Sequence, residues 1–282
     1  MSLSTRKFGK FKYFIVLNIF GKYIFMLLSK NELEFNVNSI DNAYVNRVVN
    51  VEKLFSCRYG DRDVEGVSQV LNIKRGNGYK VHTNPGICRR SRYLITNDDV
   101  IEVQGWQTSG EVEFVSIIVD DEILISVGSD NNDRVLTDMW SEFTGKIYDS
   151  AKTKQMVPAS IANEAWKYDD VKDHWDSIRL KSYVTDSGNR IPYQDFPLSD
   201  LLDLEYYFRN FPDLKSTGSI FFGGTGDVLS TVPKNLFQFQ SSLKDVTFPP
   251  DFHFEIYDPV LDRKISHGYE ILSIEESGSL SL

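Results

Sequence analysis

The stretch SGEVEFVSIIV, at residues 109–119, decides the fold of this chain and points to its chemistry. Its apolar residues mark a partly buried β-strand, and a strand turns alternate side chains toward the same face. Glu111 and Glu113 are therefore expected on one face, where two neighbouring carboxylates repel each other. In a partly buried strand that repulsion is relieved only by protonation, by solvent or by a cation.

A third acid is predicted to join the two glutamates. The next apolar run, EILISVGSD at residues 122–130, ends in Asp130, and Asp120 and Asp121 separate the two runs as a tight turn. Antiparallel pairing would bring the end of the second strand back to the start of the first, and so bring Asp130 to the glutamates. Three carboxylates suit an all-oxygen site for Mg2+, Mn2+ or Ca2+. The alternative is a solvated strand face without a metal.

Composition indicates a folded, acidic protein. The chain has 282 residues, of which 41% are hydrophobic and 13% aromatic, enough for a substantial core. The formal net charge is -9, although the first 31 residues contain six basic residues and no acidic one, so the rest of the chain is strongly acidic. This charge argues against nucleic acid as a partner. Cys57 and Cys88 are the only cysteines and form no metal-binding motif, which indicates a reducing, cytoplasmic compartment.

Residues 1–25 differ from the rest and are interpreted as a basic, hydrophobic N-terminal extension. Asn18 and Lys22 interrupt its apolar stretch, which is also short for a membrane span, so no stable span is expected. Three alternatives remain open: a mitochondrial targeting segment, a signal-anchor, or a segment that is dispensable for folding. The folded unit is then predicted to begin at Met26.

The remaining pattern is mostly strands and turns. Strands are predicted at residues 32–37, 100–106, 109–119, 122–128, 219–224, 252–260 and 264–274, with a hairpin at 176–196 that turns at 186–189. Helices are predicted at residues 61–73 and 198–208, the second capped by Ser199, with short helical pieces between 137 and 175. Strands outnumber helices without a βαβ rhythm, so the predicted class is β-rich α+β. Residues 26–99 are assigned as the N-terminal part of the domain and residues 100–278 as its metal-binding part.

Six stretches, taken together and in their order along the chain, carry a family resemblance. They are SGEVEF, VGSDNNDR, TKQM, VKDHWDSIRLKSYV, SIFFGGTGD and EIYDPVLDRKISHGYE. From about Met26 to Ile274 the chain resembles the fumarylacetoacetate hydrolase superfamily and, more closely, domain-of-unknown-function family 2848 within it. The resemblance implies a mixed β-roll with short peripheral helices, a homodimer, and one bound Mg2+, Mn2+ or Ca2+.

The resemblance implies that Glu111, Glu113 and Asp130 are the metal ligands. Superfamily members commonly follow the metal-binding Asp with a Thr or Ser, and the closer family tends to show His-Thr-Asp-Arg. This chain has Asn131 and Asn132 at the corresponding positions. The two amides put the immediate surroundings of the metal, and hence activity, in question.

The resemblance also implies four residues that meet the substrate. Lys154 matches a catalytic lysine beside the metal that contacts the oxyanion or carboxylate of the substrate. Gly224 and Thr225 match a loop that binds a carboxylate through backbone amides and a hydroxyl, although Gly226 stands where that loop usually has Pro. Arg89 corresponds to a cationic residue that follows a Pro, and it is predicted to bind a substrate carboxylate.

These parts predict a divalent-metal-dependent enzyme that acts on a small oxo-carboxylate or 1,3-dicarbonyl acid. The cation would stabilise an enolate, which is shared by C-C bond hydrolysis, decarboxylation and tautomerisation. No histidine is assigned as the general base. The alternative is a non-catalytic member of the same fold that binds a metal or a carboxylated metabolite.

Overall fold

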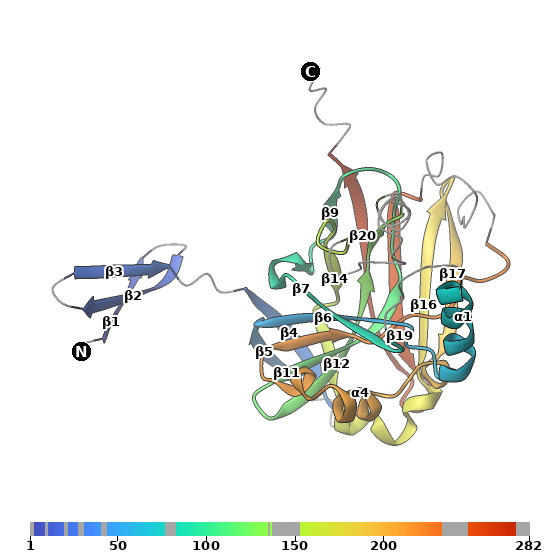
Figure 1. Cartoon of the computed structure of the whole chain (residues 1–282), viewed down its shortest axis with the longest axis horizontal. Coiled ribbons are helices and arrows are strands. Elements are labelled where there is room, and N and C mark those ends of the chain that lie inside the picture. The colour runs from blue at the N-terminus through green and yellow to red at the C-terminus, as the bar shows by residue number, and fades with distance from the viewer. Residues whose placement is uncertain are drawn as a thin grey trace, which may run out of the picture.

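The protein is built from two packed β-sheets with a few short helices around them (Figure 1). The computed structural model describes residues 3–8, 11–19, 22–27, 31–40, 44–76, 83–134, 136, 153–232 and 248–274. The larger sheet contains β4 (Glu32–Asn38), β5 (Tyr44–Asn50), β6 (Lys53–Arg58), β7 (Gly86–Arg90), β8 (Ile95–Thr96), β11 (Val112–Val119), β12 (Glu122–Asp130), β14 (Ala159–Ile161), β15 (Glu164–Lys167) and β18 (Ser219–Phe222). The five-stranded sheet contains β9 (Val100–Val103), β16 (Arg179–Asp186), β17 (Asn189–Pro197), β19 (Asp251–Asp258) and β20 (Arg263–Ser273).

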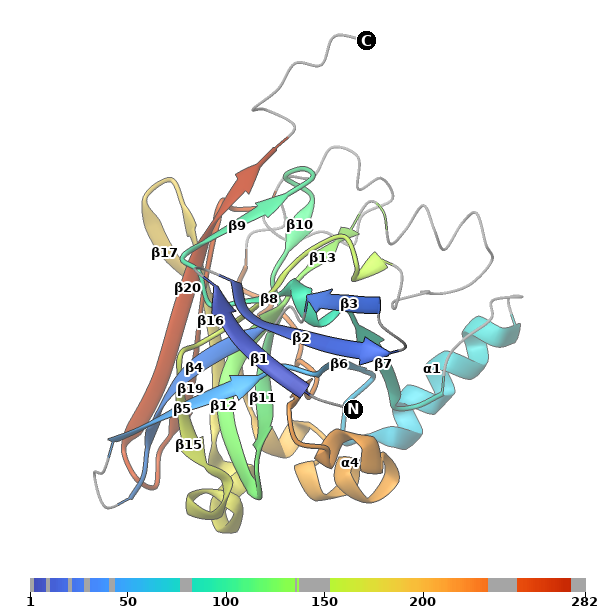
Figure 2. The same cartoon turned by 90° about the vertical axis from the view of Figure 1, so that its left-hand side faces the viewer.

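The remaining elements are small. In the part of the chain that the structure describes, the helices α1 (Val64–Gly76) and α4 (Leu204–Asn210) lie at the periphery, as both views show (Figure 2). Short 3-10 helices cover Arg92–Leu94, Tyr168–Asp170, Lys172–Ser177, Leu198–Asp200 and Pro212–Lys215. A two-stranded ladder joins β10 (Thr108–Ser109) to β13 (Asn132–Asp133). The described residues are thus dominated by strands, and the predicted β-rich class is confirmed.

The hairpin of β11 and β12 lies near the middle of the larger sheet, as the alternating sequence pattern predicts. The two strands pair from Val112 opposite Ser129 to Val119 opposite Glu122, which leaves Asp120 and Asp121 as a two-residue turn. Asp120 has a φ of 52°, a left-handed conformation that Asp tolerates better than β-branched residues do. Every residue of β11 is buried, so this strand contacts apolar side chains on both of its faces.

Those two faces belong to different hydrophobic cores. One core lies between the sheets and includes Phe114 of β11, Leu180 of β16 and Phe254 of β19. The other core includes Val115 of β11 and Phe222 of β18, and nearly all of its members come from the larger sheet. The larger sheet therefore curls around its own core, which is the β-roll that the sequence predicts. Strands from residues 26–99 and from residues 100–278 share this sheet.

Two local predictions are corrected by the structure. Helix α4 is capped by Asp203, whose side chain accepts a hydrogen bond from the backbone N–H of Tyr206, and Ser199 lies instead in the preceding 3-10 helix. For the segment 137–175 the sequence predicts short helical pieces, but its described part also contains two strands, β14 and β15. Both strands are short and pair with β12. This pairing, rather than a pattern in their own sequences, makes them strands.

The N-terminal segment forms a separate ladder of three strands. In the described residues, β1 (Leu3–Phe8), β2 (Phe11–Ile19) and β3 (Lys22–Leu27) pair only with one another. Met26 lies within β3, so the first strand of the body is β4. None of the helices in the described part of the chain has the length and apolar character that crossing a membrane requires.

We expect the free energy of unfolding of a chain that starts at Met26 to lie within about 0.5 kcal/mol of that of the full-length chain. The reason is that β1 to β3 share no strand pairing with the body, whereas Asn31, which is retained, accepts a hydrogen bond of 2.7 Å from Val51 N. Urea denaturation measures the difference. As a control, a chain that starts at Leu33 loses the Asn31 contact and should be less stable. A large loss in the Met26 chain would instead place the N-terminal segment in the folded body.

Candidate functional site

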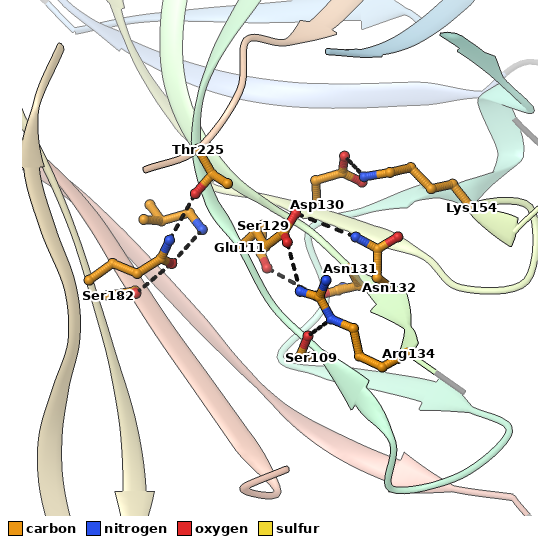
Figure 3. Close-up of polar contacts among 12 residues, drawn as sticks. Ser109, Glu111, Ser129, Asp130, Asn131, Asn132, Arg134, Lys154, Ser182 and Thr225 are labelled. Atoms are coloured by element: carbon orange, nitrogen blue, oxygen red, sulfur yellow. Dashed lines mark hydrogen bonds and ion pairs between the residues drawn. The ribbon is translucent and has the colours of Figure 1, made fainter. Parts of the chain in front are cut away.

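The structure brings the three predicted carboxylate residues to one end of the β11–β12 hairpin. The backbone N–H of Asp130 donates to Glu111 O at 3.0 Å, and Glu113 lies opposite Gly128. Residues directly opposite each other in a ladder share a face, so all three acids are on the same face of the sheet. Figure 3 shows Lys154 directed toward Asp130 and Arg134 directed toward Glu111.

Asp130 is fully buried and paired with two cations. Arg90 Nη1 donates to Asp130 Oδ1 at 2.6 Å, and Lys154 Nζ bonds to Asp130 Oδ2. Burial alone would raise the pKa of Asp130, but the charges of Lys154 and Arg90 outweigh it and the pKa is lowered. Arg90 is also held by Val157 O at 2.6 Å. Asp130 is therefore ionised and fixed from two sides.

Glu113 is in a different electrostatic environment. Its side chain is 1% exposed, and its Oε2 accepts a hydrogen bond of 2.9 Å from the backbone N–H of Gly224. Gly224 has a φ of +105°, a conformation that side-chain-bearing residues rarely adopt, and this directs its N–H at the carboxylate. Burial and the nearby charge of Asp130 raise the pKa of Glu113 well above its usual value. A bound cation would relieve this cost.

Glu111 is the most accessible of the three acids and is held by hydrogen bonds. Arg134 Nη2 donates to Glu111 Oε1 at 2.6 Å, while Arg134 Nε donates to Ser109 Oγ at 2.6 Å. Asn132 Nδ2 makes a longer contact of 3.4 Å with Glu111 Oε2. Arg134 thereby connects Glu111 to the short ladder of β10 and β13.

The donor set fits a hard divalent cation, although the side chains are not arranged as a ligand cluster. Three carboxylates and no sulfur or imidazole suit Mg2+, Mn2+ or Ca2+. As they lie, however, no three acids, histidines or cysteines in the described residues are gathered closely enough to hold an ion. Arg90 and Lys154 pair with Asp130, and Arg134 pairs with Glu111. Cation binding would therefore require Asp130 or Glu111 to exchange a protein partner for the ion.

The two amides that depart from the family pattern have separate roles. Asn131 is turned away from the acids: its Nδ2 donates to Pro158 O at 2.8 Å, and its Oδ1 accepts from Tyr269 and Ser129. Strand alternation turns the next residue, Asn132, back toward Glu111. Only Asn132 can therefore act on the candidate metal site.

We expect Asn132→Thr to tighten Mn2+ binding by about 10- to 100-fold, the size of effect that residues around a metal ligand commonly have. The substitution removes the amide that occupies Glu111 Oε2 and restores a hydroxyl at this position. Calorimetric titration with Mn2+ measures the change. Asn131→Thr is the matched control and should reduce stability instead, because it breaks the hydrogen bond to Pro158 O. Unchanged metal binding in Asn132→Thr would show that the amide has no functional meaning here.

A cavity of about 300 Å3 opens beside these acids. Its walls include Lys154, Gly224 and Thr225, three of the four residues that were predicted to meet the substrate. Arg89 is the exception, because it lies outside the cavity with its Nη2 3.4 Å from Glu52 O. Alternation along β7 turns Arg90, not Arg89, toward Asp130, so the structure does not bring Arg89 to the other site residues.

Several wall residues were not predicted from the sequence. Arg58 is the last residue of β6, and it lines the cavity together with the next three residues, Tyr59, Gly60 and Asp61. A run of charged and aromatic residues between a buried strand and a helix was the available signal. Tyr59 has a φ of 54°, a strained conformation that is common at functional loops. In the described part of the chain, no histidine lines this cavity.

The fold itself is shared with a known class of proteins. The chain has the fold of fumarylacetoacetate hydrolase family proteins, as three solved structures show. The family protein ynq8 of yeast is 11% identical with a TM-score of 0.51, over 78% of this chain and 92% of that chain. A protein of Burkholderia cenocepacia assigned as a fumarylpyruvate hydrolase is 13% identical with a TM-score of 0.51, over 88% and 94% of the two chains. A protein of Oleispira antarctica assigned as a fumarylacetoacetate isomerase/hydrolase is 14% identical, also with a TM-score of 0.51, over 85% and 99%.

The match to a family model is more specific than the shared fold. The chain belongs to the family described as "Protein of unknown function (DUF2848)", whose model matches residues 59–269. The family resemblance of the sequence is thereby confirmed. No curated protein matches the chain. At these identities the solved structures establish the fold alone.

Proposed function

We propose that this protein is a divalent-metal-dependent enzyme that acts on a small oxo-carboxylate or 1,3-dicarbonyl acid. The reaction would be C-C bond hydrolysis, decarboxylation or tautomerisation. The observation that carries the proposal is that Glu111, Glu113, Lys154 and the Gly224–Thr225 loop all line one cavity, with Asp130 bonded to Lys154 behind it. The names of structural neighbours, which include a protein assigned as a fumarylpyruvate hydrolase, support the same substrate class.

Glu111, Glu113 and Asp130 are the residues that would hold the cation. Mg2+, Mn2+ or Ca2+ would supply positive charge that polarises a chelated carbonyl group. Glu113 has the strongest electrostatic reason to bind it, because burial and the charge of Asp130 disfavour its ionised form. The cavity volume of about 300 Å3 lies at the lower end of the range for ligand pockets, which suits a small acid.

Lys154 is suited to meet the developing negative charge of the substrate. Its ammonium group is nearly fully buried and contacts Asp130, a carboxylate that Arg90 also neutralises. Because Arg90 remains, Lys154 can turn toward a substrate oxygen without leaving Asp130 as an unpaired buried charge. Preorganised cations of this kind stabilise an oxyanion most effectively in a site with little water.

Turnover of a panel of oxaloacetate, acylpyruvates and enol acids, with Mg2+ and with Mn2+, tests the proposal. Lys154→Met should lower kcat/KM about 100-fold, the usual effect of removing one group that stabilises an oxyanion. Arg209→Met, an exposed basic residue in the last turn of α4, is the control and should leave turnover unchanged. Cation binding without turnover of any compound would instead support a non-catalytic member of this fold.

A further inference from the structure

Gln194 is a buried amide that connects three parts of the site without lining the cavity. Its side chain is 1% exposed and uses its full hydrogen-bonding capacity. Its Oε1 accepts from Val112 N at 3.1 Å and from Ser182 Oγ at 2.9 Å. Its Nε2 donates to Thr225 Oγ1 and to Gly226 O, both at 2.8 Å. Figure 3 labels Ser182 and Thr225, two of the groups with which this amide forms hydrogen bonds.

A β-bulge directs Gln194 into this position. In the β16–β17 ladder, Ser182 pairs with Gln194 and Tyr183 pairs with Pro192, so Tyr193 is an extra residue on β17. Tyr193 and Gln194 are consecutive and both buried, which a regular strand with one buried face would not produce. Bulges often re-aim a side chain next to a functional site. Here the bulge brings the Gln194 amide between β11, at Val112, and the loop that contains Thr225 and Gly226.

The orientation of the Gln194 amide is fixed by its backbone partners. Val112 N–H can only donate, so it must face the amide oxygen, and Gly226 C=O can only accept, so it must face the amide nitrogen. Thr225 Oγ1 therefore receives a hydrogen bond from Gln194 Nε2. The Thr225 hydroxyl hydrogen must then point elsewhere. Its contact with Gly226 O is long, at 3.4 Å, so this hydrogen is poorly bound within the protein.

We infer that Gln194 is a positioning residue that presents the Thr225 hydroxyl as a hydrogen-bond donor to a carboxylate in the cavity. This inference rests on the proposed function, because it requires that the cavity binds a carboxylated ligand. Gln194 acts only through Thr225, which lines the cavity, and through the backbone on which Glu111 and Glu113 lie. The position of this donor relative to the glutamate strand is thus set by one side chain.

Gln194→Glu tests the inference, because it keeps the shape of the side chain and replaces both donated hydrogen bonds by an acceptor. At pH 8 the new carboxylate would accept from the Thr225 hydroxyl and withdraw it from the cavity. Oxalate, a stable dianion, is the probe, titrated calorimetrically into Mn2+-loaded protein. Its affinity should fall about 10- to 100-fold, as for loss of a hydrogen bond to a charged group. The Kd for Mn2+ should stay within a factor of three of the wild-type value.

Ser182→Ala is the matched control: it removes a contact of Gln194 Oε1 while Val112 N still fixes the amide, so oxalate binding should be unchanged. Thr225→Val should weaken oxalate binding as much as Gln194→Glu does, whereas Thr225→Ser should bind oxalate like the wild type. The double variant Gln194→Glu with Thr225→Val should bind oxalate no more weakly than Thr225→Val alone. Equal oxalate binding by wild type and Gln194→Glu, or additive losses in the double variant, would overturn the inference. Wild-type protein that binds neither Mn2+ nor oxalate would overturn the proposed function instead.

Discussion

Glu113→Gln is expected to weaken Mg2+ and Mn2+ binding by more than about 100-fold, beyond the range that changes around a ligand usually produce. The substitution removes one of three carboxylates on the shared face of β11 and β12, and the one with the strongest reason to bind a cation. Added metal should raise the melting temperature of the wild-type protein and do so far less in the variant. Calorimetry measures the affinities, and equal binding by both proteins would show that Glu113 is not part of the metal site.

The same substitution should stabilise the metal-free protein at neutral pH. The folded-state pKa of Glu113 is raised by burial and by Asp130, so its favourable contribution is complete below the usual Glu pKa and is lost as the pH rises through the raised value. A neutral Gln escapes this loss. Denaturation in chelator should therefore show Glu113→Gln gaining on wild type from pH 5 to pH 8. A stability difference that is independent of pH would contradict the raised pKa.

Asp130→Asn is expected to destabilise the metal-free protein by about 3–5 kcal/mol, the cost of removing one partner from a buried ion pair. Arg90 and Lys154 would both lose the carboxylate that balances their charge in a buried environment. Neutralising these two candidate ligands should thus change the stability of the metal-free protein in opposite directions at neutral pH. The charge of Glu113 destabilises the folded state, whereas the charge of Asp130 stabilises it through Arg90 and Lys154. Urea denaturation of both variants in chelator distinguishes them.

The pH dependence of Asp130 also has the opposite sign. Its folded-state pKa is lowered, so its contribution is present above the usual Asp pKa and is lost as the pH falls through the folded-state value. Asp176→Asn provides a matched control, because Asp176 pairs with Arg62 at the surface with 60% of its side chain exposed. Surface ion pairs contribute about 0–1 kcal/mol. A cost for Asp130→Asn no larger than that of the control would show that the buried pairs do not hold the site together.

Local patterns account for the hairpin and for the position of its acids. A side-chain period of two puts Glu111 and Glu113 on one face, and a two-residue turn fixes where Asp130 returns. Helix α1 and the β16–β17 hairpin follow from the same kind of local information. These features depend on residues that are neighbours in the sequence, which is why they could be predicted.

The features that the sequence could not place depend on contacts between distant segments. Either Arg89 or Arg90 can be the inward residue of a strand, since a shift of one residue exchanges the two faces. Only the pairing of β7 with β6 and the presence of buried Asp130 decide for Arg90. Likewise, β14 and β15 are strands because β12 offers them a pairing edge, not because their short sequences require it.

The sequence by itself determined that Glu111 and Glu113 share a face at the start of β11 and that Asp130 returns to them. It also determined the family to which the chain belongs. The tertiary structure alone decided which cations pair with those acids and which amide donates to Thr225. Gln194 lies 82 residues from Val112 along the chain, and the two meet only because a bulge in one sheet faces the hairpin of another. Periodicity is a property of a segment, whereas the pairing of two buried groups depends on how whole sheets pack.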